Sequence, residues 1–250
     1  MSGHSKWSTI KRQKGVTDKR RGALFSKLSR EIAIAARSGA DPQTNIRLRL
    51  VVQKARDINM PMDNITRAIQ RGGGGGEGGN LEELTLEGYG TSGVAVLVEA
   101  LTDSRNRTVQ EVRNIFSRHG GSLAASGAVA WLFDSRGVIT VDTPTPEETA
   151  LEAIDAGAED VKTEGTFIEV YTRPQDLERV LHALEARKLK VASSEVSLVP
   201  RSTTQVDERV AIQNLKLLEA LEELEDVRSV HTNLDYSEAV LEKLKVSGLV

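Results

Sequence analysis

Apolar and cationic side chains follow a helical period from Asp18 onward. With 3.6 residues per turn, one face of the expected helix collects apolar residues and the opposite face collects cations. The apolar face consists of Leu24, Phe25, Leu28, Ile32 and Ala35, and the cationic face of Arg20, Lys27, Arg30 and Arg37. We therefore expect a helix that packs on one side and presents positive charge on the other.

Two further short helices are predicted before residue 72. Ser38-Gly39 ends the first helix, and Asp41-Pro42 has the residue types of an N-cap and a first helical position, so a second helix should run to about residue 58. Pro61 begins a third over residues 64–71. Residues 1–71 therefore form a basic arm plus a three-helix domain, and residues 72–79, with seven glycines around Glu77, form a linker.

Beyond residue 80 the pattern alternates between strands and helices. Strands at 84–89 and 94–101 precede a helix that Ser104 caps and that runs to about residue 118. A hairpin of strands at 129–133 and 138–141 opens a β-β-α-β-β-α-β order, which contains the ferredoxin-like β-α-β-β-α-β unit. The remaining elements are a helix at 146–156, strands at 160–163 and 167–172, a helix at 174–187, a strand at 191–199, a helix at 207–224 and a strand at 227–233.

This order predicts an α+β multidomain fold in which two ferredoxin-like domains follow the helices, one inserted into the other. The first β-β-α unit lacks its second half, and the last helix and strand supply it if connections stay short and unknotted. We expect a discontinuous α+β domain over residues 80–127 and 204–238, an inserted α+β domain over residues 128–203, and a C-terminal tail over residues 239–250.

Charge divides the chain in two. Residues 1–71 carry 16 Lys and Arg against five Asp and Glu, whereas the rest carries 17 against 31, although the whole chain has a net charge of only −3. A basic block on an acidic chain predicts a polyanionic partner at one end, and nucleic acid is the obvious one. The chain has no Cys, no secretory signal pattern and no apolar stretch long enough for a bilayer, so we expect a cytoplasmic protein without a membrane partner.

The arm holds cations, one aromatic residue and no acid. Clustered cations bind phosphates by releasing counterions, and Trp7 could stack on an unpaired base, which contributes about 1–3 kcal/mol. If the arm continues the cationic helix face, these residues form one track. The alternatives are a solvated tail and helix face, with His4 as an ordinary titratable residue. The candidate nucleic-acid-binding residues are His4, Lys6, Trp7, Lys11, Arg12, Lys14, Arg20, Lys27, Arg30, Arg105 and Arg107.

Arg105 and Arg107 lie in the first turn of a predicted helix, where the helix dipole disfavours cations and backbone N–H groups favour anions. They are either a second phosphate contact or partners of Asp103 or Glu111. The acids at the end of the last predicted helix are expected to repel nucleic acid or to form a solvated face. These acids are Glu219, Glu222, Glu223, Glu225 and Asp226.

Catalytic motifs are missing from the sequence. It contains no His-Glu-x-x-His, no Gly-x-Ser-x-Gly, no P-loop and no Cys nucleophile. Its four His residues are well separated, which disfavours a metal site and general acid–base chemistry. We expect a non-enzymatic protein with no cofactor, no metal and no small-molecule substrate.

Several motifs resemble the YebC/PmpR family over nearly the whole chain. They are Gly3-His4-Ser5-Lys6-Trp7, Phe25-Ser26-Lys27-Leu28 with Arg30-Glu31-Ile32, Asn59-Met60-Pro61 with Asp63-Asn64-Ile65, Glu87-Gly88-Tyr89-Gly90, and Leu101-Thr102-Asp103-Ser104-Arg105-Asn106-Arg107-Thr108. The resemblance implies an N-terminal helical domain, two α+β domains and a non-catalytic role in gene expression. The family includes probable bacterial transcriptional regulators and mitochondrial translational activators. The glycine run at residues 72–79 is longer than the family pattern.

Three functions fit these observations. The first is a DNA-binding transcriptional regulator. The second is a ribosome-associated translation factor that binds ribosomal RNA, favoured because Asp41-Pro42 follows a loop that is a poor match to a helix-turn-helix and because a basic arm with Trp7 suits splayed bases. The third is a protein–protein scaffold built on the acidic domains.

Overall fold

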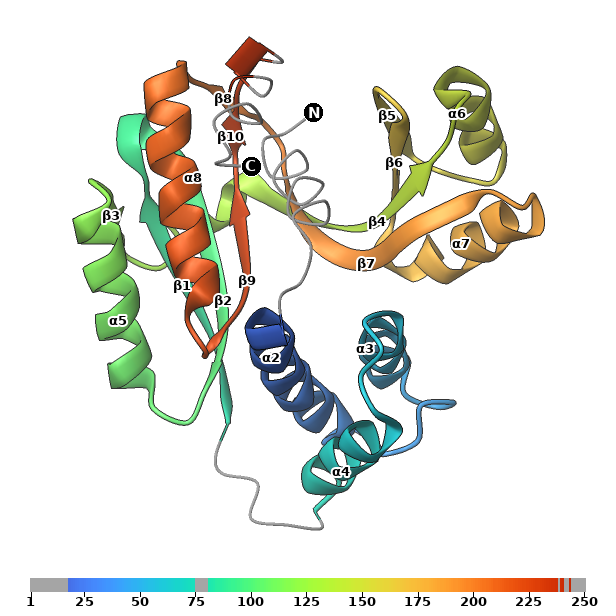
Figure 1. The fold of residues 1–250 in the computed structure, drawn as a ribbon, viewed down its shortest axis with the longest axis horizontal. Coiled ribbons are helices and arrows are strands. Elements are labelled where there is room, and N and C mark those ends of the chain that lie inside the picture. The colour runs from blue at the N-terminus through green and yellow to red at the C-terminus, as the bar shows by residue number, and fades with distance from the viewer. Residues whose placement is uncertain (1–17, 75–80, 238, 241–242, 244–250) are drawn as a thin grey trace.

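The computed structural model describes residues 18–74, 81–237, 239–240 and 243. The predicted basic arm, with candidates His4 to Lys14, lies outside the described residues, as do most of the linker and of the C-terminal tail. Three bodies make up the described part: a helical domain and two α+β units, with the helical domain placed against both (Figure 1).

The helical domain buries the apolar face that the sequence predicts. Leu28, Ile32 and Ala35 form its core together with residues of the other two helices, and Leu24 and Phe25 pack at its margin. The three helices are α2 (Asp18–Ala36), α3 (Ile46–Asp57) and α4 (Met62–Gly72).

The predicted start of the second helix is wrong by several residues. Asn45, and not Asp41, is the N-cap of α3: its side-chain oxygen accepts the Leu48 N–H at 3.0 Å. The Asn45 amide also donates to the carbonyls of Ala35 and Gly39 at 2.7 and 2.8 Å, which fixes the end of α2 against the start of α3. Asp41 instead accepts the Gln43 N–H at 2.9 Å in the preceding turn.

Gly72 lies where two helices of the helical domain cross. It is the last residue of α4, and α4 crosses α2 there so closely that a Cβ atom would lie 2.0 Å from the Ala33 carbonyl oxygen. Only glycine permits this approach of the two backbones.

The first sheet joins segments that are far apart in the sequence. Its strand order is β3-β1-β2-β9, and β9 pairs antiparallel with β2 so that Val230 faces Val98. Helices α5 and α8 pack on one face of this sheet, so that Phe116 of α5 and Leu218 of α8 share a core with Val98 of β2 (Figure 1). The elements are β1 (Glu82–Tyr89), β2 (Ala95–Thr102), α5 (Arg105–Arg118), β3 (Ser122–Leu123), α8 (Glu208–Glu223) and β9 (Val227–Thr232).

The second sheet has the ferredoxin-like order. Strands β5-β6-β4-β7 are all antiparallel to their neighbours, and two helices pack on the sheet around a core that includes Ile139, Ile168 and Leu184. Its chain segment lies between β3 and α8 of the first unit, so one α+β unit is inserted into the other. The elements are β4 (Phe133–Asp142), α6 (Pro146–Asp155), β5 (Asp160–Glu164), β6 (Phe167–Thr172), α7 (Leu177–Ala186) and β7 (Lys190–Pro200).

The predicted hairpin at residues 129–141 is wrong. Ala130–Leu132 forms a 3-10 helix, and Phe133–Asp142 is one continuous strand that pairs with β7 from end to end. Gly137, which suggested a turn, lies in the middle of this strand. The position needs glycine because a Cβ atom there would lie 2.3 Å from the Thr172 hydroxyl oxygen. Glycine occurs both in turns and in strands at positions of close packing, and the sequence pattern alone does not distinguish the two cases.

Short elements complete the fold. Thr204–Gln205 (β8) and Leu234–Asp235 (β10) pair in parallel, and 3-10 turns occur at Thr91–Gly93 and Pro174–Asp176. The predicted fold class is confirmed, while the predicted domain bounds stay predictions. Within the described ranges, no helix has both the length and the apolar character of a membrane span.

Candidate nucleic-acid interface

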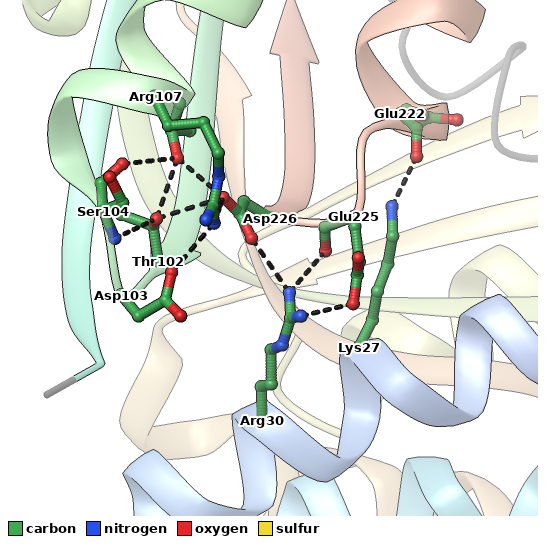
Figure 2. A network of polar contacts seen from close by, with 10 residues as sticks. Lys27, Arg30, Thr102, Asp103, Ser104, Arg107, Glu222, Glu225 and Asp226 are labelled. Atoms are coloured by element: carbon green, nitrogen blue, oxygen red, sulfur yellow. Dashed lines mark hydrogen bonds and ion pairs between the residues drawn. The ribbon is translucent and has the colours of Figure 1, made fainter. Parts of the chain in front are cut away.

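The cationic face of α2 points at the α+β domains. The Lys27 ammonium donates to the Glu222 carbonyl, and Arg30 pairs with the carboxylates of Glu225 and Asp226 (Figure 2). Directly after the end of α2, about two turns beyond Arg30, Arg37 donates to the Leu81 carbonyl at 2.8 Å. The face is thus an internal contact surface in this structure. Arg20 lies in α2, and its side chain is outside the described residues.

Asp226 is the centre of this contact. Its Oδ1 atom lies 3.0 Å from Arg30 Nη1, and its Oδ2 atom accepts from Arg107 Nη2 at 2.7 Å. The hydroxyls of Thr108 and Thr102 donate to the same Oδ2 at 2.7 and 3.0 Å. The side chain is only 5% exposed. Burial alone would raise the pKa of Asp226, but the hydrogen bonds from Arg107, Thr108 and Thr102 and the Arg107 charge outweigh it and lower the pKa.

Arg105 and Arg107 have different surroundings. Arg107 donates to Asp226 and to Asp103, the latter at 2.9 Å, and these bonds raise its pKa. Pairing with Asp103 is the alternative that the sequence left open for this residue. Arg105 is exposed at the start of α5, and no ion pair of its side chain occurs in the described part of the chain. A phosphate contact at Arg105 stays a prediction.

The second helix of the domain contacts the inserted α+β unit. Arg49 forms a two-pronged ion pair with Glu178 of α7, with both N–O distances at 2.9 Å. Lys54 pairs with Glu195 of β7 at 3.2 Å. Since α2 contacts β9, and Arg49 and Lys54 of α3 pair with residues of α7 and β7, cations of the helical domain join it to both acidic units.

A charged cluster lies between these contacts. Glu99 of β2 accepts from Arg228, Ser229 and His231 of β9 at 3.2, 2.6 and 3.0 Å. Burial alone would raise its pKa, but the His231 hydrogen bond, the neighbouring positive charges and the Ser229 hydroxyl lower it to about 2. Glu31 of α2 faces the same region, and burial raises its pKa despite Lys54 and Arg228 nearby.

Of the four predicted site residues whose side chains the structure describes, three lie together and one lies apart. Lys27, Arg30 and Arg107 meet at residues 222–226, whereas Arg105 stands alone. The expectation that the acidic run is a solvated face is wrong for Asp226, which is buried among donors. Thr102 and Thr108 were missed as site residues, although both lie in a family-like motif around the predicted cap Ser104.

Comparisons with known proteins agree with this architecture. The family model for the N-terminal domain of TACO1/YebC proteins matches residues 5–75, and the model for their second and third domains matches residues 81–234. A probable transcriptional regulatory protein of Dehalococcoides mccartyi is 53% identical over 246 residues, which cover 97% of this chain and 98% of the relative. One from Rubrobacter xylanophilus is 51% identical over 245 residues, covering 96% and 98%.

A solved structure has the same fold. The crystal structure of a conserved hypothetical protein from Aquifex aeolicus superimposes with a TM-score of 0.81 at 46% identity, covering 88% of this chain and 93% of that one. Because the two family models together span the helical domain and both α+β units, the chain belongs to the TACO1/YebC family.

Proposed function

We propose that this protein is a cytoplasmic, non-catalytic regulator of gene expression that binds nucleic acid through its N-terminal domain. The observation that carries the proposal is the concentration of 16 Lys and Arg in residues 1–71 of an otherwise acidic chain. Such clustering supplies affinity for a phosphate backbone irrespective of sequence. The relatives' name, probable transcriptional regulatory protein, supports a regulatory role.

A feature of the helical domain favours duplex DNA. Helices α3 and α4 are joined by only four residues, 58–61, and Asn59 has the left-handed φ of 59° that a tight turn uses. Turns of three to four residues are typical of helix-turn-helix motifs. Arg67, Gln70 and Arg71 of α4 are exposed, so this helix could enter a major groove. The poor match to a helix-turn-helix that the sequence suggests concerns the connection before α3, which is longer than the one between α3 and α4.

Ribosomal RNA is the second candidate. Helices α2 and α3 are separated by residues 37–45, which is too long a connection for a groove-docking helix pair. The arm, with Trp7 among cations, suits the splayed bases of folded RNA better than a regular duplex. In this case the protein would be a ribosome-associated translation factor.

Sedimentation of cell lysate through a sucrose gradient tests the proposal and separates its two forms. The full chain is compared with a variant in which Lys11, Arg12 and Lys14 are changed to Glu. Wild type that travels with ribosomal particles, while the variant stays at the top, supports the RNA form. Wild type recovered instead on chromosomal DNA, with the variant lost from it, supports the DNA form.

A matched variant controls for net charge. Arg113, Arg209 and Lys216 are exposed cations of α5 and α8, and changing all three to Glu alters the total charge by the same amount. This variant should follow the wild type. Loss of nucleic-acid association in both variants would mean that total charge, and not the N-terminal domain, decides binding. Wild type found on neither particle nor DNA would contradict the proposal.

A further inference from the structure

The acceptors that surround Arg30 resemble a phosphate backbone. Its guanidinium donates through Nη1 to Asp226 Oδ1 at 3.0 Å and to the Glu225 carbonyl at 3.1 Å, and through Nη2 to the Glu225 carboxylate. Lys27, one turn earlier, binds the Glu222 carbonyl (Figure 2). A row of anionic and carbonyl oxygens facing a planar guanidinium and an ammonium is also what a nucleic-acid strand offers.

We propose that residues 222–226 are an internal mimic of a nucleic-acid backbone, which covers the cationic face of α2 in the free protein and is displaced when nucleic acid binds. The inference rests on the proposed function, because it requires that the N-terminal domain binds nucleic acid. It adds a competition between the protein's own acidic turn and the ligand for Lys27 and Arg30.

If α2 dissociates from this contact, the buried carboxylate of Asp226 keeps most of its hydrogen-bond donors. Asp226 divides its partners: Oδ1 accepts from Arg30, whereas Oδ2 accepts from Arg107, Thr102 and Thr108, all within the first α+β unit. The Asp226 backbone carbonyl also accepts the Leu101 N–H at 2.7 Å. When Arg30 departs, water needs to replace only the Oδ1 contact. Release therefore avoids the penalty of an unpaired buried carboxylate.

The other partner of Arg30 is accessible. The Glu225 side chain is 70% exposed, so its ion pair is screened by solvent and is open to competition by phosphates. Arg30 itself is 24% exposed and exchanges one set of anionic oxygens for another. A ligand of low charge density gains little binding energy from this exchange, whereas a phosphate backbone can bind both Lys27 and Arg30.

Two single substitutions on the same turn test the competition. Glu225→Lys repels Arg30, whereas Glu223→Lys makes the same charge change at an exposed position for which no ion pair occurs among the described residues. The affinity of the full chain for a labelled short single-stranded RNA, and separately for a labelled DNA duplex, is measured by fluorescence anisotropy. We expect Glu225→Lys to bind about fivefold more tightly than Glu223→Lys, the size of one exposed ion pair lost from the closed form.

Neutral variants separate release from added charge. Glu225→Gln removes the ion pair without adding a cation, and it should tighten binding relative to Glu223→Gln. The chain has no Cys, so a Thr66→Cys and Gln213→Cys pair on exposed positions of α4 and α8 accepts a donor and an acceptor dye. Adding the RNA or the duplex should lower energy transfer, and Glu225→Lys should lower it without nucleic acid.

The outcomes distinguish the two proposals. If wild type binds nucleic acid, Glu225 and Glu223 variants bind alike and energy transfer stays constant, the competition is refuted and the proposed function stands. If neither wild type nor any variant binds either probe, the proposed function fails and the competition fails with it.

Discussion

Arg30 of α2 and Asp226, 196 positions later in the chain, form an ion pair with 3.0 Å between Nη1 and Oδ1. Asp226 also accepts from Arg107 at the start of α5 and immediately precedes β9. One carboxylate therefore joins the helical domain to two elements of the first α+β unit. Arg30, which the sequence places on an outward cationic face, is an interdomain contact in the structure.

Asp226→Asn should destabilise the protein far more than Glu225→Gln. The amide removes the charge that compensates Arg30 and Arg107 and turns one of two acceptor oxygens into a donor that faces other donors, so we expect a cost of about 3 kcal/mol. Glu225 is 70% exposed, and its change should cost less than about 1 kcal/mol. Urea unfolding followed by circular dichroism measures both, and equal midpoints for the two variants would show that the Asp226 network does not stabilise the fold.

Glu99 should make stability depend on acid pH. Its folded pKa of about 2 lies below the ordinary value of 4.5, so its ionised form stabilises the fold fully above pH 4.5, and that contribution is lost as pH falls towards 2. At neutral pH, Glu99→Gln leaves His231 and Arg228 without their carboxylate and should cost about 1–3 kcal/mol.

The gap between wild type and Glu99→Gln should therefore close as the pH is lowered. Melting temperatures recorded at a series of pH values from neutral to about pH 2 check this. Two curves that stay parallel over the whole series would mean that Glu99 titrates alike in the folded and unfolded chain.

Two Gly→Ala changes in the helical domain should alter the free energy of unfolding in opposite directions. At Gly72 the new methyl group would lie 2.0 Å from the Ala33 carbonyl oxygen, which forces α2 and α4 apart and should cost about 1–3 kcal/mol. At Gly22, an exposed position of α2 with no atom within 4 Å, alanine should stabilise the helix by about 0.5–1 kcal/mol. Thermal unfolding of both variants checks the signs, and a Gly72→Ala protein as stable as wild type would rule out the close crossing.

The cap of α3 is Asn45 and not Asp41, the residue that the sequence predicts. Asn45→Ala removes the bond from Leu48 and the two bonds to Ala35 and Gly39, so the loss should be at least about 1 kcal/mol. Asp41→Ala removes one exposed turn contact and should stay within about 0.5 kcal/mol of wild type. Denaturation midpoints in the reverse order would place the cap at Asp41.

The sequence predicts local structure well because the relevant signals are local. The five apolar positions of α2 recur with the helical period, and all five lie in the core or pack against it. The inserted domain follows from the order of its strands and helices alone. The continuity of β4 does not follow, because Gly137 has the residue type of a turn, and only the neighbouring Thr172 and strand β7 hold it in a strand.

The sequence predicts which residues belong to the site but not which residues they contact. A helical wheel shows that Lys27 and Arg30 share a face, but what lies opposite that face is set by contacts some 195 residues away in the chain. The charge pattern of the sequence nevertheless contains one indication of this interdomain contact. An excess of cations on α2 and an excess of acids at residues 219–226 are complementary, and two such surfaces within one chain can pair with each other.

The most direct test of nucleic-acid binding by the N-terminal domain is the salt dependence of affinity. Wild type and a variant with Lys11, Arg12 and Lys14 changed to Gln are titrated against the same labelled RNA and DNA at increasing salt. If these cations neutralise phosphates, the variant binds more weakly, and the slope of log affinity against log salt is shallower by about 0.7–0.9 for each phosphate contact removed. Equal affinities and equal slopes for the two proteins would contradict the account.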